Sequence, residues 1–542
     1  MDKSLAMLAA NWLEECTRKH DLCRPVDPAF RPTRLIQILG ADKVKLILPA
    51  EEHSGPYVAF SHCWGGVEAL KLRRHDLSRF RTGLGINELP ASYQEAISIC
   101  PSMNLYFIWI DSLCIIQDSD EDWEREAVNM KLVYGNASLN LCAATGSNCL
   151  EKSFTSREPF LFKPLELVSS WSNQEPQNFL LTFTDMFQED VSESPLHARA
   201  WVYQEYYLSK RSLILGRGQM WWHCSEVLAC EGHPNGMSDG LGTWQSGASS
   251  LKHNSDQEPL RNSGHISPYC SASGWVHRVK QYARTCLTKE TDRAIAFSGV
   301  AQAFGESHNI TEKYLAGLWR CHLLRDICWG VRFRCITRRR VGYRAPSWSW
   351  ISLDGPFDLC PDIEQGPSVA FLERVWAHYG HQEKGIIALS KGGGLEVCGH
   401  LMGPRRVGAK GEPSYFEISA DQPCGNIPDS REPWHKVLWD EHDSAEEPMV
   451  SYLDKLNLRC RGKPLVDGGC RETLRLKDAE GSFFYLPIHE SGLVLYGLVL
   501  YQPTHQSGIF HRVGKWESNA CLDKSDISSL RVVYPRQIVY II

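Results

Sequence analysis

Long apolar runs are absent from this sequence. In 542 residues no segment approaches the ~20 uninterrupted apolar residues of a transmembrane helix. The first twenty residues, MDKSLAMLAANWLEECTRKH, also lack the apolar core of a secretory signal peptide. We therefore expect a protein with no membrane span that resides in the cytoplasm.

An excess of basic residues is also absent. The chain has 58 Lys and Arg against 64 Asp and Glu, a formal net charge of -6. Bulk charge therefore gives no basis for binding nucleic acid or anionic membrane, and we expect no nucleic-acid partner. With 43% hydrophobic residues, the chain has a globular composition and is long enough for two or three domains.

The 20 cysteines show no C-x-x-C pair of the kind that makes a zinc site a strong prediction. Two groups come closer than the rest. Cys16, His20 and Cys23 are spaced i, i+4 and i+7, hence on one helical face. A second group occupies one short span: His223, Cys224, Cys230 and His233. The first group lacks an identifiable fourth ligand, so we interpret both as packed positions and assign no metal.

From Tyr57 onward, apolar segments alternate between strand and helix patterns. The predicted strands cover residues 57–64, 105–111 and 139–146, and the predicted helices cover 89–100 and 122–137. Strand–helix–strand alternation with right-handed crossovers predicts an α/β fold with a parallel sheet.

Three blocks in this region resemble a known family. They are YVAFSHCWGG (57–66), YFIWIDSLCIIQDSDEDWEREAVNMKLVYGNASL (106–139) and RAWVYQEYYLSKRSLILGRGQMWWHCSE (199–226). Their order and content are similar to those of the fungal heterokaryon-incompatibility (HET) domain. Departures are slight: Phe60, His62 and Ile116 replace residues commoner in the family.

With this resemblance, changes in composition divide the chain into five parts. We predict an N-terminal helical lead-in (1–56), a HET domain (57–230), a flexible connector (231–274), a helical segment (275–340) and a β-rich C-terminal region (341–542). The connector is assigned from its Gly, Ser, Asn, His and Pro content.

Candidate site residues lie where the predicted strands end. Ligands gather at the carboxyl ends of parallel strands, because loops diverge there and helix N-termini point into the crevice. The first strand runs out at Ser61, Trp64 and the pair Gly65 and Gly66, and the second runs out at Asp111. The glycine pair could instead form a tight strand exit, and Asp111 could cap neighbouring backbone amides.

The helix over 122–137 supplies a further candidate. Its apolar stripe consists of Trp123, Ala127, Met130, Tyr134 and Ala137. Glu126 lies roughly 60° from the centre of that stripe. It could look into the crevice as a catalytic carboxylate or decorate a solvated flank. Similarly, Arg199 could bind a phosphate or form an ion pair.

The resemblance implies a role in fungal non-self recognition and programmed cell death. Two mechanisms stay open. The domain could be a death-effector module that associates with protein partners or with itself and needs no cofactor. Alternatively, HET domains have been compared in fold with TIR domains, which implies an NAD glycohydrolase with NAD as substrate. Asp111 and Glu126 would then be catalytic, and Ser61, Trp64, Gly65, Gly66 and Arg199 would hold the nucleotide.

Overall fold

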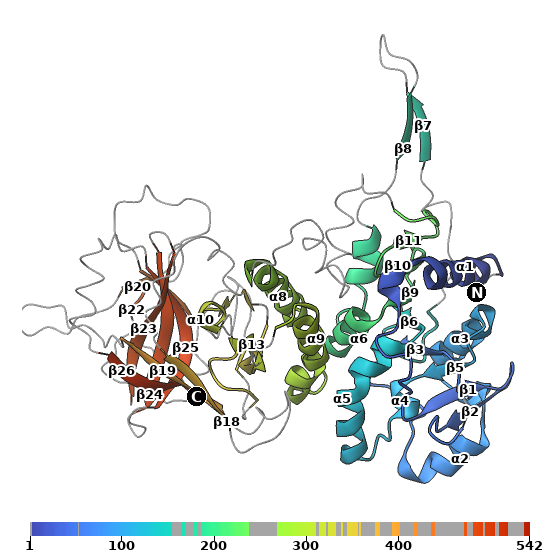
Figure 1. Cartoon of the computed structure of the whole chain (residues 1–542), viewed down its shortest axis with the longest axis horizontal. Helices are drawn as coiled ribbons and strands as arrows, with labels where there is room; N and C mark the ends of the chain where they lie inside the picture. The colour runs from blue at the N-terminus through green and yellow to red at the C-terminus, as the bar shows by residue number, and fades with distance from the viewer. Residues whose placement is uncertain are drawn as a thin grey trace, which may run out of the picture. The chain divides into compact units, whose positions relative to one another are not determined.

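The computed structural model describes residues 3–52, 54–153, 165–169, 177–181, 186–237, 268–310, 314–320, 323–331, 338–339, 344–355 and 357–358, and nine strands beyond residue 373. Two compact units share these residues (Figure 1). Unit 1 comprises Met1–Ile266 and Thr285–His308, and unit 2 comprises Ser267–Arg284 and Asn309–Ile542.

A nine-stranded sheet forms the centre of unit 1, in the order β11-β10-β9-β6-β3-β5-β1-β2-β4. The strands are β1 (Leu35–Ile38), β2 (Lys43–Ile47), β3 (Tyr57–Ser61), β4 (Leu84–Gly85), β5 (Phe107–Trp109), β6 (Leu139–Ala143), β9 (Arg211–Leu215), β10 (Met220–Cys224) and β11 (Leu228–Cys230). The four central strands, β5, β3, β6 and β9, are parallel to one another. This arrangement confirms the α/β class predicted from the alternating pattern.

The expected parallel sheet is nevertheless a mixed one. On one side, β1, β2 and β4 pair antiparallel, and on the other β10 and β11 do the same. The physical reason is connection length. Short loops join β1 to β2 and β9 to β10, and such loops form hairpins, whereas a parallel crossover needs a dozen or more residues.

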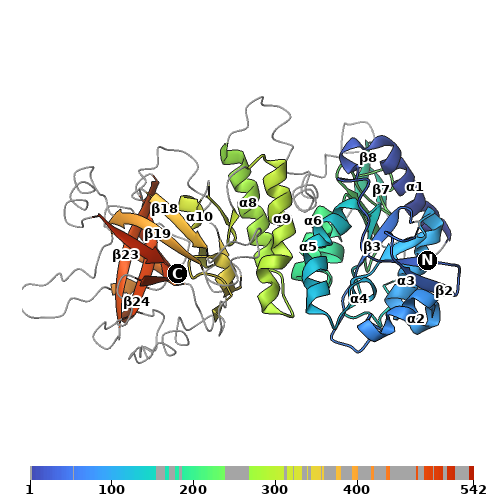
Figure 2. The same ribbon diagram turned by 60° about the horizontal axis from the view of Figure 1, so that its bottom comes forward.

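Helices cover both faces of this sheet. Figures 1 and 2 place α5 (Asp120–Asn136) and α6 (Ala200–Leu208) on one face, and α1 (Lys3–Lys19) and α3 (Ala91–Ile99) on the other. The side chains of neighbouring residues on the central strands point to opposite faces, so Phe60 packs edge-on against Tyr93 of α3. Smaller helices are α2 (Leu77–Thr82) and α4 (Asp111–Cys114).

Helix α5 begins where its sequence provides a cap. The Ser119 hydroxyl accepts a hydrogen bond from the Asp122 amide, and the acidic first turn suits the positive end of the helix dipole. Tyr134 of this helix packs edge-on against Trp109 of β5, with ring centroids 5.7 Å apart. The apolar stripe therefore faces the sheet, as predicted, although Trp123 at its start is only half-buried.

Helix α9 (Arg293–Ser307) completes unit 1 by packing on α6. The Gly299 amide donates to Gln204 Oε1 over 2.9 Å. A Cβ at residue 299 would lie only 2.6 Å from that oxygen, so glycine is what allows the two helices to approach. Helix α8 (Pro268–Ala283) belongs to unit 2.

Unit 2 contains a C-terminal sheet in the order β18-β19-β26-β25-β24-β23, with β21 also paired to β25. Its strands are β18 (Arg374–Tyr379), β19 (Gly393–His400), β21 (His435–Trp439), β23 (Gly481–Ser491), β24 (Val494–Pro503), β25 (Ile509–Ser518) and β26 (Arg536–Ile541). The five-part division of the chain stays a prediction, and its connector lies largely outside the described residues. Among the helices that are described, none is both long and apolar enough to cross a bilayer.

Candidate functional site

Ser61, the last residue of β3, lies in a buried polar network. Its Oγ hydrogen bonds to Glu205 Oε2 of α6 and lies 3.0 Å from Asn140 Oδ1 of β6. All three side chains are at most 4% exposed. A hydroxyl carries one proton, so Ser61 donates to one of these oxygens at a time. The network links two neighbouring strands to the helix that covers them.

The Glu205 carboxyl has an unusual electrostatic environment. Burial raises its pKa to about 7, although the charge of Arg199 and hydrogen bonds from Ser61 and Tyr134 oppose that effect. At neutral pH the carboxyl is therefore about half protonated. A carboxyl with this pKa can accept or release a proton under physiological conditions, which is a property shared by many catalytic groups.

His62 points to the opposite face and makes a second network. Tyr93 Oη of α3 lies 2.8 Å from His62 Nε2 and 2.9 Å from Ser112 Oγ. Burial lowers the pKa of His62 to about 4, against the opposing charge of Asp111. The imidazole is therefore neutral at physiological pH.

Asp111, the first residue of α4, connects this network with the strand exit. Its Oδ1 accepts from the Ser112 amide over 2.6 Å, and its Oδ2 accepts from Trp64 Nε1 over 2.8 Å. The side chain is 22% exposed. Asp111 thus makes the backbone contact expected of a local cap and still reaches solvent at the carboxyl end of β5.

The two glycines after β3 differ in their surroundings. Both have positive φ, +74° at Gly65 and +67° at Gly66. A Cβ on Gly65 would lie 2.5 Å from the Asn148 Cα, so this glycine is required by the close passage of the loop after β6. A Cβ on Gly66 would meet nothing within 4 Å. Gly65 therefore forms the tight strand exit, whereas the Gly66 backbone is open to solvent.

Arg199, the residue before α6, lies at the same carboxyl edge of the sheet. Its guanidinium donates to the carbonyl oxygen of His62, and its positive charge lowers the pKa of both His62 and Glu205. The structure therefore gathers six of the seven residues selected from the sequence at the carboxyl edge of β3 and β5: Ser61, Trp64, Gly65, Gly66, Asp111 and Arg199.

Glu126 makes its contacts in a different place. It is 1% exposed and faces Arg34, whose Nη1 lies 4.0 Å from Glu126 Oε1. Arg34 also donates to both carboxylate oxygens of Asp122, over 2.8 and 3.0 Å. We call these residues, with Arg125, the Arg34 cluster. The segment before β1 covers the edge of the α5 stripe on which Glu126 lies, so its carboxylate is buried beside Arg34 and does not belong to a solvated flank.

Burial acts on both carboxylates of the Arg34 cluster, with opposite net results. Burial raises the pKa of Glu126, and the hydrogen bond from Thr33 and the charge of Arg34 only partly oppose it. Burial also acts to raise the pKa of Asp122, but hydrogen bonds from Arg34 and the Ile116 amide outweigh it and bring that pKa below its ordinary value. Asp122 is therefore the carboxylate to which Arg34 is primarily bonded.

Four further residues belong to the two polar networks at this edge of the sheet and were not among the candidates selected from the sequence: His62, Tyr93, Asn140 and Glu205. One signal was available, because Asn140 is a polar residue inside the apolar strand LNLCA. Its amide nitrogen is buried and has no acceptor among the described residues. Glu205 lies in the third sequence block, where no local pattern marks it as a buried carboxyl.

Comparison with known families gives one match within unit 1. Residues 57–205 match the family model described as heterokaryon incompatibility protein (HET). The chain carries a HET region. The resemblance found in the three sequence blocks is thereby confirmed. Neither a curated protein nor a solved structure matched the chain.

The HET region accounts for only part of unit 1. It begins at the first residue of β3 and ends at Glu205 inside α6. Strands β1 and β2 precede it and β9 to β11 follow it, yet all of them belong to the same sheet. The folded unit is therefore larger than the region that the family match covers.

Proposed function

We propose that this protein is a cytoplasmic signalling protein of fungal non-self recognition, whose HET region promotes programmed cell death by associating with protein partners or with further copies of itself. The family match supports the biological role. The observation that favours association over chemistry is the burial of Ser61 and Glu205, because their polar atoms bond to one another and are almost inaccessible to a ligand.

Cleavage of NAD is the second candidate function, supported by the partly exposed Asp111 and by the raised pKa of Glu205 at the same edge. Breaking the bond between nicotinamide and ribose develops positive charge on the ribose carbon, which a nearby carboxylate stabilises. Asp111 and Glu126 are the proposed catalytic carboxylates. Ser61, Trp64, Gly65, Gly66 and Arg199 would contact the nucleotide. The pairing of Glu126 with Arg34 weighs against its part in this mechanism.

An assay of nicotinamide release separates the two functions. Purified full-length protein at high concentration is incubated with NAD, and nicotinamide is measured by chromatography. The association hypothesis predicts no release by folded protein. Release that is abolished by Asp111→Asn would establish catalysis and contradict the first proposal.

Matched variants then test the role of Glu126 in cells. Under the association hypothesis, Glu126→Gln at equal protein abundance leaves toxicity intact, as does the exposed control Glu124→Gln. Loss of both nicotinamide release and toxicity in Glu126→Gln alone would assign catalysis to that residue.

Self-association has its own measurement. Light scattering coupled to size-exclusion chromatography should show a concentration-dependent increase in mass, and variants that stay monomeric should be non-toxic. If toxicity persists in a strictly monomeric variant with no binding partner recovered, the association hypothesis is wrong.

A further inference from the structure

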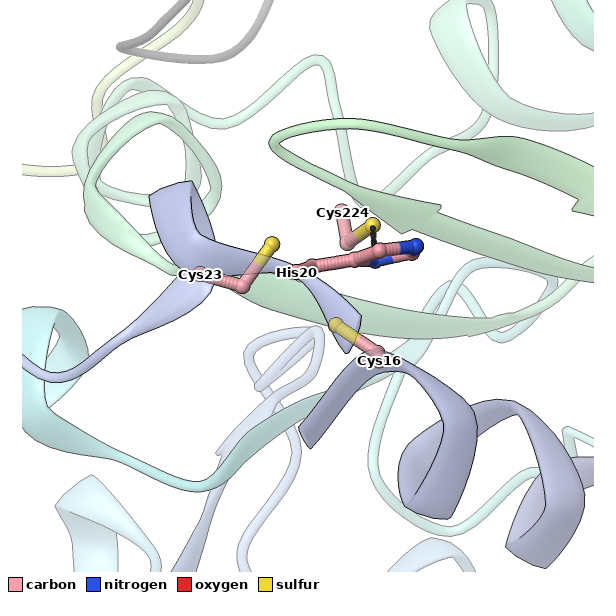
Figure 3. A group of neighbouring side chains, drawn as sticks. All are labelled: Cys16, His20, Cys23 and Cys224. Carbon is pink, nitrogen blue, oxygen red and sulfur yellow. Dashed lines mark hydrogen bonds between the residues drawn. The ribbon is translucent and has the colours of Figure 1, made fainter. Parts of the chain in front are cut away.

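Four side chains from distant parts of unit 1 meet beside the HET region. Cys16 lies in α1, His20 follows that helix, and Cys23 ends the 3-10 turn η1 (Asp21–Cys23). Cys224, the last residue of β10, approaches them although it lies 204 positions after His20 along the chain (Figure 3). The four potential ligand atoms all lie within 4.8 Å of one another. We call this group the Cys₃His cluster.

We propose that the Cys₃His cluster binds a structural Zn²⁺ ion. Zinc takes four ligands in a tetrahedron, and three thiolates with one imidazole are an established ligand set. Zn–S distances of ~2.3 Å and Zn–N distances of ~2.0 Å place tetrahedral ligand atoms about 3.5 to 3.8 Å apart. Cys224 Sγ lies 3.4 Å from His20 Nδ1, close to that separation.

The surroundings of the sulfur atoms suit thiolates bound to a metal. The Val227 amide donates to Cys224 Sγ over 3.2 Å, and Arg211 Nε donates to Cys16 Sγ over 3.1 Å. The Ser225 amide also donates to Cys23. Zn²⁺ with three thiolates carries one net negative charge, and the guanidinium of Arg211 compensates it. Donors of this kind orient metal ligands and adjust their basicity.

The elements that supply the ligands are also held together by other contacts. Trp12 Nε1 donates to the Pro234 carbonyl over 2.7 Å, and the Leu22 amide donates to Glu226 Oε1 over 2.8 Å. The three cysteines are buried, which keeps the cluster away from bulk solvent. Four protein ligands leave no open coordination position, so the site is structural rather than catalytic.

The Cys₃His cluster lies entirely outside the residues that match the HET family. Three ligands precede residue 57 and the fourth follows residue 205. A bound ion would therefore fasten the segment before the HET region to the strands after it. Metal binding would couple to folding of unit 1 as a whole, because the ligands come together only in the folded chain.

Three of these ligands share one helical spacing in the sequence, whereas Cys224 stands in a different sequence group, with His223, Cys230 and His233, so the sequence alone predicts no metal site. In the structure, His223 Nδ1 lies 2.5 Å from Tyr206 Oη, and Cys230 Sγ lies 3.8 Å from His233 Nδ1. Adjacent strand residues point to opposite faces, so Cys224 separates from His223 and joins the first group.

Metal analysis of the full-length protein tests the proposal. Protein purified under reducing conditions from zinc-containing medium should retain about one zinc per chain after dialysis. Cys224→Ser should lose that zinc. Cys230→Ser is the matched control, since Cys230 is a buried cysteine on the adjoining strand, and it should retain the metal.

A second pair of variants separates metal binding from folding. His20→Cys creates a Cys₄ set and should keep zinc, whereas His20→Ala should bind it weakly or lose it. Replacement by Co²⁺ should give the intense ligand-field bands of a tetrahedral thiolate site, and these should shift in His20→Cys. A chelator should lower the melting temperature of the wild type, and added zinc should restore it.

Three results would overturn the proposal. The first is folded wild-type protein that contains no zinc after purification in its presence. The second is a Co²⁺ spectrum without thiolate coordination, and the third is a disulfide between two of the three cysteines under reducing conditions. Equal metal content in His20→Cys and His20→Ala would likewise exclude His20 as a ligand.

Discussion

Among the described residues of unit 1, two glutamates are buried, and their surroundings differ in kind. Glu126 faces cations, with Arg34 Nη1 4.0 Å away and Arg125 Nε donating to it over 3.4 Å. Glu205 is bonded instead to the neutral hydroxyls of Ser61 and Tyr134, and Arg199 acts on it only through its charge. Burial raises the pKa of both carboxyl groups, and that of Glu205 reaches about 7.

This contrast shows that burial alone does not identify a reactive carboxylate. The Arg34 cluster holds its charges in ion pairs, which specify how α5 packs against the segment before β1. The network at Glu205 leaves a titratable proton at the carboxyl edge of the sheet. If unit 1 catalyses a reaction, Glu205 is a better candidate than Glu126 for the catalytic carboxyl group.

Removing the cation should have the largest effect on stability. Arg34→Met leaves the buried carboxylates Asp122 and Glu126 with only the half-exposed Arg125 as a cationic partner, so the free energy of unfolding should fall by about 3 to 5 kcal/mol at pH 7.5. Urea unfolding of unit 1 measures this change. The loss should shrink toward pH 4, because protonation of the two carboxylates relieves their repulsion. Arg31→Met, at an exposed arginine nearby, should change stability by less than about 0.5 kcal/mol.

Glu205→Gln should give the next largest effect, and it should depend on pH. The folded-state pKa of Glu205 is raised, so ionisation destabilises the folded protein as pH rises from about 4.5 to about 7. Above pH 7, Glu205→Gln should therefore be more stable than the wild type by roughly 3 kcal/mol, and the difference should vanish below pH ~4.5.

Comparing these two proteins at each pH isolates Glu205 from His62. The lowered pKa of His62 has the opposite sign, since its stabilising contribution is lost as pH falls from about 6.5 to about 4, but it is present in both proteins. A difference in stability that does not change between pH 4.5 and pH 8 would contradict the assigned titration of Glu205.

Ser61→Ala should have a smaller effect. It removes the hydroxyl that bonds to Glu205 Oε2, and leaving a buried acceptor with one fewer donor should cost about 1 to 2 kcal/mol. Because that hydrogen bond lowers the pKa of Glu205, its loss should move the pH-dependent transition upward. Ser98→Ala, at an exposed serine of α3, serves as the control and should leave the transition in place.

Glu126→Gln should have the smallest effect, below about 1 kcal/mol, because Asp122 still neutralises Arg34 after the substitution. In an Arg34→Met background, the same change should partly restore stability by removing one uncompensated charge. The double-mutant cycle measures this coupling. If Glu126→Gln alone destabilised the protein as much as Arg34→Met, the ion pair with Asp122 would not dominate the cluster.

Local sequence signals predicted much of the HET region. Strand patterns ending in Ser61 and Asp111 placed both residues at carboxyl ends of parallel strands, and the stripe on α5 predicted the face that packs on the sheet. These predictions hold because hydrophobic periodicity and strand ends are properties of short segments. The position of Glu126 relative to the stripe was also predicted from local sequence. Its partner Arg34, however, lies 92 residues earlier in the chain. The environment of the Glu126 carboxylate could therefore not be predicted from the sequence.

The sequence by itself determined the α/β class, the HET match over residues 57–205 and the residues at the strand exits, because each depends on a short continuous pattern. Tertiary structure alone decided three matters: the antiparallel flanks of the sheet, the pairing of Ser61 with Glu205, and the meeting of Cys224 with Cys16, His20 and Cys23. The contacts of Ser61 with Glu205 and of Cys224 with the first group join residues far apart in the chain. The two flanks form by local hairpins, but they join the parallel strands only through the long-range pairs β1–β5 and β6–β9. Burial of a common core brings such distant residues within bonding distance.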